Sequence, residues 1–162
     1  MISQRFIAMP SETARSFREG MTDAHGQPPE RHVSDGAGNP CRHCLADIAE
    51  GAPFLILAWQ PFPGPQPYAE TGPVFLHAED CERHGEADGM PAMFLGHEQL
   101  LLRGYGHDDR IVYGTGQIVA PVELERAAAS LLDRPDIAYL HVRSAGYNCY
   151  QCRIERAPPG AV

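Results

Sequence analysis

Residues 137–155 read IAYLHVRSAGYNCYQCRIE, and this stretch decides the fold class. Apolar and polar side chains alternate on both sides of SAGYN, a short segment of turn-forming residues. Alternation with a period of two is typical of β-strands, whose successive side chains point to opposite faces. We therefore predict a last pair of strands, over residues 137–143 and 149–155, joined by a turn. In this pattern Cys152 is a core residue, and Cys149 belongs to the more polar face.

The rest of the chain gives further strands and three predicted helices. Apolar runs predict strands over residues 5–9, 54–59, 74–78, 100–105 and 110–114, the last two as a hairpin around GHDD that residues 117–119 extend. Capping residues, proline at the first turn and helical periodicity predict helices over residues 11–20, 39–51 and 121–132. The polar segment 21–38 is predicted as a loop.

These elements predict an α+β protein. Strands dominate and neighbours often stand at hairpin distance, so we expect a mostly antiparallel mixed sheet with about three helices. The 16 glycines and 15 prolines indicate long loops between them. A chain of 162 residues fits one domain, over residues 1–162, with a flexible tail at 157–162.

Charge and hydropathy exclude several classes of protein. The formal net charge of −8, without a basic run, argues against nucleic acids and anionic membranes as partners. The N-terminal residues lack the apolar core of a secretory signal, and no apolar run has transmembrane length. We therefore expect a cytoplasmic protein, in which the five cysteines stay reduced thiols.

Two short segments carry ligands that suit zinc. In NPCRHCLADI, residues 39–48, Cys41 and Cys44 have the C-x2-C spacing of structural zinc sites. In HAEDCERH, residues 77–84, His77 and Cys81 lie within an H-x3-C-x2-H pattern that ends at His84. We predict that Cys41, Cys44, His77 and Cys81 form a mixed site for zinc. A second C-x2-C pair, Cys149 and Cys152 in CYQC, cannot share an ion if the segment is a continuous strand, because the two cysteines then lie on opposite faces. A turn within residues 149–152 would bring them together, but the alternation favours a strand.

Two other interpretations remain open. One is a thiol-dependent enzyme or redox protein: Cys41 at the start of a predicted helix would gain thiolate character from the helix dipole, with Cys44 as its partner. The same class includes Cys149 as a nucleophile beside His141 on the paired strand. The other is a binding module for a small anionic ligand, formed by Tyr139, His141 and Arg143 on one strand face. Buried cysteines that only pack in the core are the alternative without a site.

Four long stretches support a family resemblance. NPCRHCL, PYAETGPVFLHA, RGYGHDDRIVYGTG and YLHVRSAGYNCYQCRIER resemble the bacterial family Domain of Unknown Function 1203. The likeness runs from the first predicted strand to Arg156. It implies a small, single-domain, cytosolic bacterial protein and assigns no activity or site residue.

Overall fold

The structure is a computed structural model that describes residues 2–160, and the chain divides into two compact units. Residues Ala8–His84 form the first, here called the three-stranded unit. Residues up to Ile7 and those from Gly85 onward form the second, the five-stranded unit. A single domain over residues 1–162 stays a prediction. Of the tail predicted to be flexible, residues 161–162 lie outside the described residues, whereas the Ala157 N–H donates to the Ser3 carbonyl at 2.8 Å.

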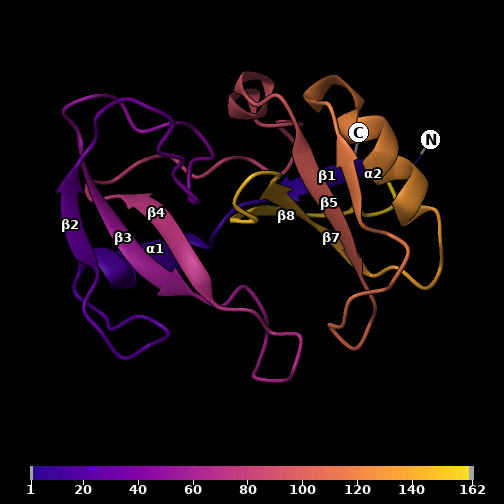
Figure 1. Ribbon diagram of the computed structural model, residues 1–162, viewed down its shortest axis with the longest axis horizontal. Helices are drawn as coiled ribbons and strands as arrows, with labels where there is room; N and C mark the ends of the chain where they lie inside the picture. The colour runs from indigo at the N-terminus through magenta and orange to yellow at the C-terminus, as the bar shows by residue number, and fades with distance from the viewer. Residues whose placement is uncertain (1, 161–162) are drawn as a thin grey trace. The chain divides into compact units, whose positions relative to one another are not determined.

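The five-stranded unit is an antiparallel sheet covered by one α-helix. Its strand order is β1-β8-β7-β5-β6, and helix α2 (Leu124–Leu132) packs against β5, β7 and β8 (Figure 1). The predicted pairing of the last two strands is confirmed, with a bulge after Val142. The strands are β1 (Gln4–Ile7), β5 (Leu100–Tyr105), β6 (Gln117–Val119), β7 (Tyr139–Ser144) and β8 (Tyr150–Arg156).

The face of this sheet toward α2 is its core. Alternate residues of the strands supply apolar side chains that are fully buried, among them Leu102, Leu140 and Ile154. Cys152 pairs with Val142 and is also fully buried, which confirms it as a core residue. Helix α2 adds Leu124 and Leu132 among other apolar side chains, as its helical periodicity predicted.

The three-stranded unit contains the second sheet. Strands β2 (Glu30–Val33), β3 (Pro53–Trp59) and β4 (Gly72–His77) are antiparallel, in the order β2-β3-β4. Helix α1 (Ser11–Arg18) lies beside β3 and β4 (Figure 1). It buries Ala14 and Phe17 in the same core as side chains of these two strands. Every residue of β2 is exposed, so this edge strand lacks the alternation by which strands are recognised, and we wrongly predicted a loop there.

The helix count and the single sheet need correction. Over residues 2–160 the structure has two α-helices, not three, and two short 3-10 helices, η1 (Ala92–Gly96) and η2 (Pro121–Glu123). The helix predicted over residues 39–51 is wrong, and the strands form two antiparallel sheets. The strand predicted over residues 110–114 is reduced to an isolated bridge, and β6 takes its place beside β5. No helix of the described chain is both long and apolar enough to cross a membrane.

Candidate metal centre

Four ligand-type side chains of the three-stranded unit meet at one point. One ligand atom from each of Cys41, Cys44, His77 and Cys81 lies within 4.8 Å of the other three. These are the four residues that the sequence predicted as a zinc site. Cys41 is buried and the other three are partly exposed. The group can hold a metal ion at the rim of the core rather than at its centre.

The distances between these atoms suit one tetrahedral ion. The Sγ atoms of Cys41 and Cys81 are 3.9 Å apart, and Cys44 Sγ lies 3.5 Å from His77 Nδ1. With Zn–S about 2.3 Å and Zn–N about 2.0–2.1 Å, a tetrahedron has edges of about 3.8 Å (S···S) and about 3.6 Å (S···N). A disulfide would need about 2.05 Å between sulfurs. These two distances are therefore compatible with ligands around a single ion and not with a disulfide.

A tight turn, not a helix, presents the first two cysteines. The Leu45 N–H donates to the Cys41 carbonyl at 2.9 Å, and the Cys41 N–H donates to the Ala46 carbonyl at 3.0 Å. Leu45 has a φ of 53°, the left-handed conformation that glycine usually supplies at the end of such a turn. Its side chain is only 2% exposed. Burial of a leucine, worth about 1.5–3 kcal/mol, offsets the backbone cost of this conformation.

The turn is tied to strand β4, which carries the third ligand. The Arg42 N–H donates to the Phe75 carbonyl at 3.0 Å, and the Arg42 guanidinium lies 5.8 Å from the centre of the Phe75 ring. The His77 N–H points at Cys41 Sγ, 3.4 Å away. His77 is the last residue of β4, so the end of the strand places its imidazole beside the turn.

Cys81 comes from an irregular segment, not from a helix. Residues 78–84 lie in neither helix nor strand. Arg83 anchors this segment because its guanidinium donates to the Ala8 and Met9 carbonyls at 2.7 and 3.1 Å. The His84 N–H donates to the His43 carbonyl at 3.0 Å, but the His84 side chain is not among the four clustered ligands. Of the H-x3-C-x2-H pattern, only the first two residues join the site.

His43 and Ser11, which are not candidate ligands, form a hydrogen-bonded pair beside Cys81. His43 Nδ1 lies 3.1 Å from Cys81 Sγ, and His43 Nε2 lies 2.9 Å from Ser11 Oγ. Burial and then the positive charge of Arg18 lower the pKa of His43, which keeps its imidazole neutral. A metal-bound thiolate only accepts hydrogen bonds, so with a metal on Cys81 the proton of His43 would be on Nδ1 and Nε2 would accept from the Ser11 hydroxyl. Sequence spacing gave no sign of this pair.

Arg18 of helix α1 adds a positive charge. Its guanidinium donates to Cys81 Sγ at 3.2 Å and to the His77 carbonyl at 2.9 Å. A divalent ion with three thiolates carries a net charge of −1, which the guanidinium offsets. Arg18 also forms an ion pair with Asp80 at 3.6 Å. The Asp80 carboxylate is exposed to solvent, so this pair contributes little to stability.

The sulfur atoms already influence one another without a metal. Hydrogen bonds from the thiols of Cys44 and Cys81 lower the pKa of Cys41. The same contact with the Cys41 sulfur raises the pKa of Cys44 and the pKa of Cys81. The contacts among the three sulfurs therefore favour ionisation of Cys41 over ionisation of Cys44 or Cys81. A bound divalent cation would let all three ionise.

The residues predicted as an anion site are buried in the five-stranded unit. Tyr139, His141 and Arg143 share one face of β7, and each is at most 4% exposed. The His141 ring lies 4.8 Å from the Tyr150 ring, and an Arg143 nitrogen lies 3.4 Å from His141 Nδ1. Burial, followed by the charges of three arginines, lowers the pKa of His141 well below its ordinary value. The anion site stays a prediction.

The predicted pair of Cys149 and His141 is not in strand register. Cys149 precedes β8, where its N–H donates to Ser144 Oγ at 3.0 Å and its carbonyl accepts from the Ser144 N–H. His141 instead stands opposite Arg103 on β5 and Arg153 on β8. A thiol-dependent enzyme at these residues stays a prediction that rests on no contact. No helix begins at Cys41, so the helix-dipole argument for a redox role of Cys41 and Cys44 is wrong, and that role stays a prediction.

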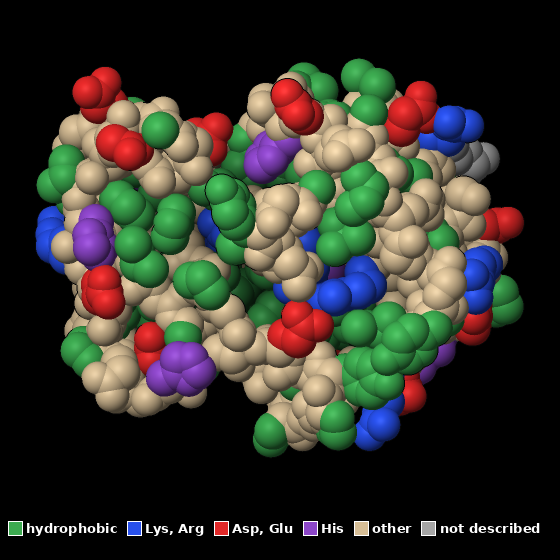
Figure 2. All heavy atoms as spheres, in the orientation of Figure 1, with side chains coloured by type: hydrophobic (Ala, Val, Ile, Leu, Met, Phe, Trp, Pro, Cys, Tyr) green, Lys and Arg blue, Asp and Glu red, His purple; other side chains and the backbone are tan. Residues whose placement is uncertain are grey.

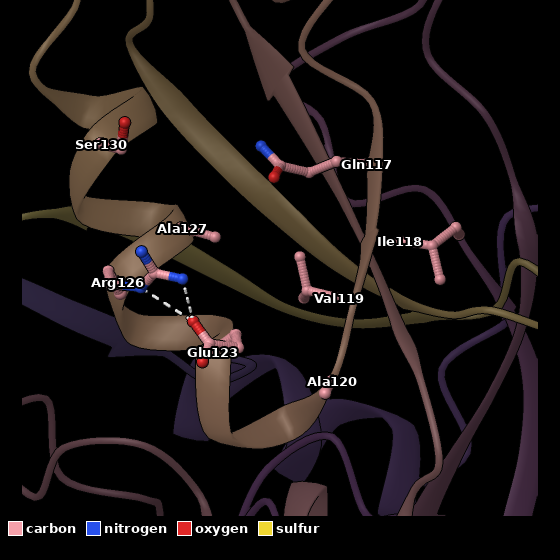
Figure 3. A pocket seen from close by; sticks show the side chains of 8 residues that line it. All are labelled: Gln117, Ile118, Val119, Ala120, Glu123, Arg126, Ala127 and Ser130. Atoms are coloured by element: carbon pink, nitrogen blue, oxygen red, sulfur yellow. Dashed lines mark hydrogen bonds and ion pairs between the residues drawn. The ribbon is translucent and has the colours of Figure 1, made fainter.

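The surface offers two further features. An open groove of the five-stranded unit lies between strand β6 and helix α2, with Gln117 and Val119 on one side and Arg126 and Ser130 on the other (Figure 3). An ion pair between Arg126 and Glu123 occupies the helix side of the groove (Figure 3).

The 13 basic residues are all arginines, and on the face drawn in Figure 2 they lie in small separate groups among acidic and apolar side chains.

The fold and the site define a small α+β protein with a candidate Cys3His metal centre. The chain belongs to the family described as Protein of unknown function (DUF1203), whose model matches residues 38–156. The matched region includes all four candidate ligands, whereas Ser11 and Arg18 of helix α1 precede it. No curated protein matches the chain, and no solved structure matches it.

Proposed function

We propose that this chain is a small zinc-binding protein in which Cys41, Cys44, His77 and Cys81 hold one structural Zn²⁺. The observation that carries the proposal is the mutual distance of the four ligand atoms, all within 4.8 Å. The distance of 3.9 Å between the Sγ atoms of Cys41 and Cys81 matches the S···S edge of a zinc tetrahedron. The distance of 3.5 Å between Cys44 Sγ and His77 Nδ1 matches its S···N edge. Three sulfurs and one nitrogen also suit the borderline-soft character of zinc.

The number of ligands favours a structural role for the ion. Catalytic zinc sites keep three protein ligands and an open position for water or substrate, whereas structural sites use four. Here four side chains are available to fill a tetrahedron, and the Arg18 guanidinium and His43 Nδ1 lie 3.2 and 3.1 Å from the Cys81 sulfur. The metal would join the turn at Cys41 and Cys44 to the segment after β4.

The proposal includes a location and a class of partner. Thiols bind zinc only when reduced, so the cytoplasm is the compartment in which three of them remain available. The net charge of −8 opposes nucleic acids and anionic membranes and leaves a small-molecule ligand as the partner to seek.

Metal content tests the proposal directly. The chain, produced without a histidine tag, is analysed by inductively coupled plasma mass spectrometry beside the variants Cys44→Ser and Cys149→Ser. We expect about one zinc per chain in the parent and in Cys149→Ser, whose thiol lies outside the cluster. Cys44→Ser should lose most of its zinc after dialysis against a weak chelator.

Two results would contradict parts of the proposal. Less than about a tenth of an equivalent of any metal in the parent would remove the metal centre. About one equivalent of iron would keep the site and overturn the assignment of zinc.

A further inference from the structure

Two of the candidate ligands are placed to react with each other. The Sγ atoms of Cys41 and Cys81 are 3.9 Å apart, and a disulfide requires about 2.05 Å. A movement of about 2 Å by one sulfur would therefore join them. Cys81 lies in the irregular segment 78–84, in neither helix nor strand, whereas backbone hydrogen bonds fix Cys41 in its turn. Cys81 therefore has the smaller backbone restraint, and its movement would stretch the side-chain contacts of its sulfur with Arg18 and His43.

The two sulfurs also differ in access to solvent. Cys81 is partly exposed and Cys41 is completely buried. Cysteines that sense oxidants are accessible to solvent and have a second thiol nearby that resolves the first oxidation product, and they react as thiolates, the form that zinc ligation would impose on Cys81. Cys81 meets the first condition and Cys41 the second.

The surroundings of Cys81 favour attack on a peroxide. The Arg18 guanidinium, 3.2 Å from Cys81 Sγ, places a positive charge where a leaving hydroxide would become negative. His43 Nδ1, at 3.1 Å, gives the same sulfur a second donor. Neither Arg18 nor His43 is among the four clustered ligands, so their contacts with the sulfur do not depend on metal binding.

We infer that the zinc centre, on which this inference rests, releases its metal when a peroxide oxidises Cys81 and Cys41 completes a disulfide. The Cys81 thiolate attacks the peroxide: an S–O bond forms, the O–O bond breaks, and hydroxide leaves and takes up a proton. The Cys41 thiolate then attacks the Cys81 sulfur, an S–S bond forms, and the S–O bond breaks with loss of a second hydroxide, which also becomes water. The two sulfurs lose two electrons and the peroxide gains them. Only Cys44 and His77 would then remain as ligands, too few to hold a zinc ion in a structural site.

Zinc release and peptide mapping test the inference on the zinc-loaded full chain. Hydrogen peroxide is added in stepwise equivalents, and free zinc is followed with a colorimetric chelator. After alkylation, digestion with trypsin and an endoproteinase specific for glutamate cuts after Arg42, Glu50, Glu79 and Glu82, so that Cys41, Cys44 and Cys81 fall on separate peptides. We expect peptide 32–42 to be linked to peptide 80–82, with about one zinc released per disulfide. Dithiothreitol and fresh zinc should restore the centre.

The possible results separate failure of this inference from failure of the proposed function. Zinc retained at several equivalents of peroxide, a disulfide between Cys41 and Cys44, or prior oxidation of Cys149 would overturn the inference and leave the zinc centre intact. A chain without zinc before peroxide is added would overturn the proposed function, and the inference with it.

Arg18→Gln tests the part played by the guanidinium. Loss of one hydrogen bond to a charged group should slow peroxide-driven zinc release about fivefold to tenfold. Arg18→Lys, which keeps the charge, should restore much of the rate. Arg15→Gln, on the exposed side of the same helix, is the matched control. An unchanged rate in Arg18→Gln would remove the assigned role of this residue.

Discussion

The imidazole of His43 lies 3.1 Å from the sulfur of Cys81, although the two residues are 38 positions apart. In the sequence His43 stands between Cys41 and Cys44, yet its ring contacts Cys81, a candidate ligand from the segment after β4. Partners of this kind, which orient a ligand without touching the metal, commonly change metal affinity by about 10–100-fold when they are replaced.

Replacement of His43 should therefore weaken zinc binding. We expect His43→Leu to lower the zinc affinity by about 10–100-fold because the Cys81 sulfur loses a donor. His43→Asn, whose amide can donate from a similar position, should recover part of the loss. Affinity is measured by competition with a chromophoric chelator, and His32→Leu, at an exposed histidine paired with Glu30, is the control. Equal affinities in the Leu variant and the parent would contradict the role of His43.

Removal of zinc should lower thermal stability. A ligand that binds only the folded state at 100 times its dissociation constant stabilises it by about 2.7 kcal/mol. For a chain of this size, that corresponds to a fall in Tm of about 5–11 °C when a chelator removes the metal. Differential scanning calorimetry with and without chelator gives the shift. A Tm that does not depend on zinc, in a chain that demonstrably binds it, would contradict the coupling of metal to folding.

At Leu45 we expect the glycine variant to be more stable than the alanine variant, the reverse of the usual order of these two residues. Leu45 has a φ of 53° and is 2% exposed, so either variant loses the buried side chain, at about 2–5 kcal/mol for Leu→Ala. Alanine keeps the cost of the left-handed conformation and glycine does not. We therefore expect Leu45→Gly to be more stable than Leu45→Ala by about 1 kcal/mol. Urea denaturation of the zinc-loaded variants measures the difference, and a more stable alanine variant would refute it.

His141 makes stability depend on pH. Burial lowers its pKa in the folded state, whereas the unfolded side chain titrates at about 6.5. Below that pH the unfolded state binds the additional proton, so the stabilising contribution is complete above pH 6.5 and is lost as the pH falls toward the folded pKa. The slope from this one group is at most about 1.4 kcal/mol per pH unit.

The variant His141→Phe isolates this effect. We expect its free energy of unfolding to fall less steeply than that of the parent between about pH 6.5 and pH 4.5. Both chains are measured without metal, because acid also protonates zinc ligands. Parallel pH profiles for the two chains would show that His141 does not titrate between the folded and unfolded states.

Local patterns predicted the ligands of the candidate site but not its supporting residues. Cys41 with Cys44, and His77 with Cys81, are close in sequence, so ligand chemistry and spacing identified both pairs. Ser11 and Arg18 come from a helix more than twenty residues before Cys41, and no spacing rule connects a helix to a distant sulfur. Only the folded structure brings Ser11 within hydrogen-bond distance of His43, and Arg18 within hydrogen-bond distance of Cys81.

The wrong helix at residues 39–51 has a physical explanation. Asn39 and Pro40 are good first residues of a helix, and Cys41, Cys44 and Ile48 have helical spacing. The same spacing also arises when a tight turn buries those side chains. The left-handed conformation of Leu45, which ends the turn, is uncommon for leucine and leaves no sign in the sequence. The fold class was more predictable, because alternation within β7 and β8 extends over whole strands.

The sheet order of the five-stranded unit imposes a sequence of events during synthesis. Among the described strands of this sheet, β1 is made before the other four, and its one neighbour in the sheet order, β8, is made after them. All four candidate zinc ligands precede β5, because the last of them is Cys81. A nascent chain therefore contains all four candidate ligands before β5 to β8 are made, while β1 stays unpaired until β8 follows.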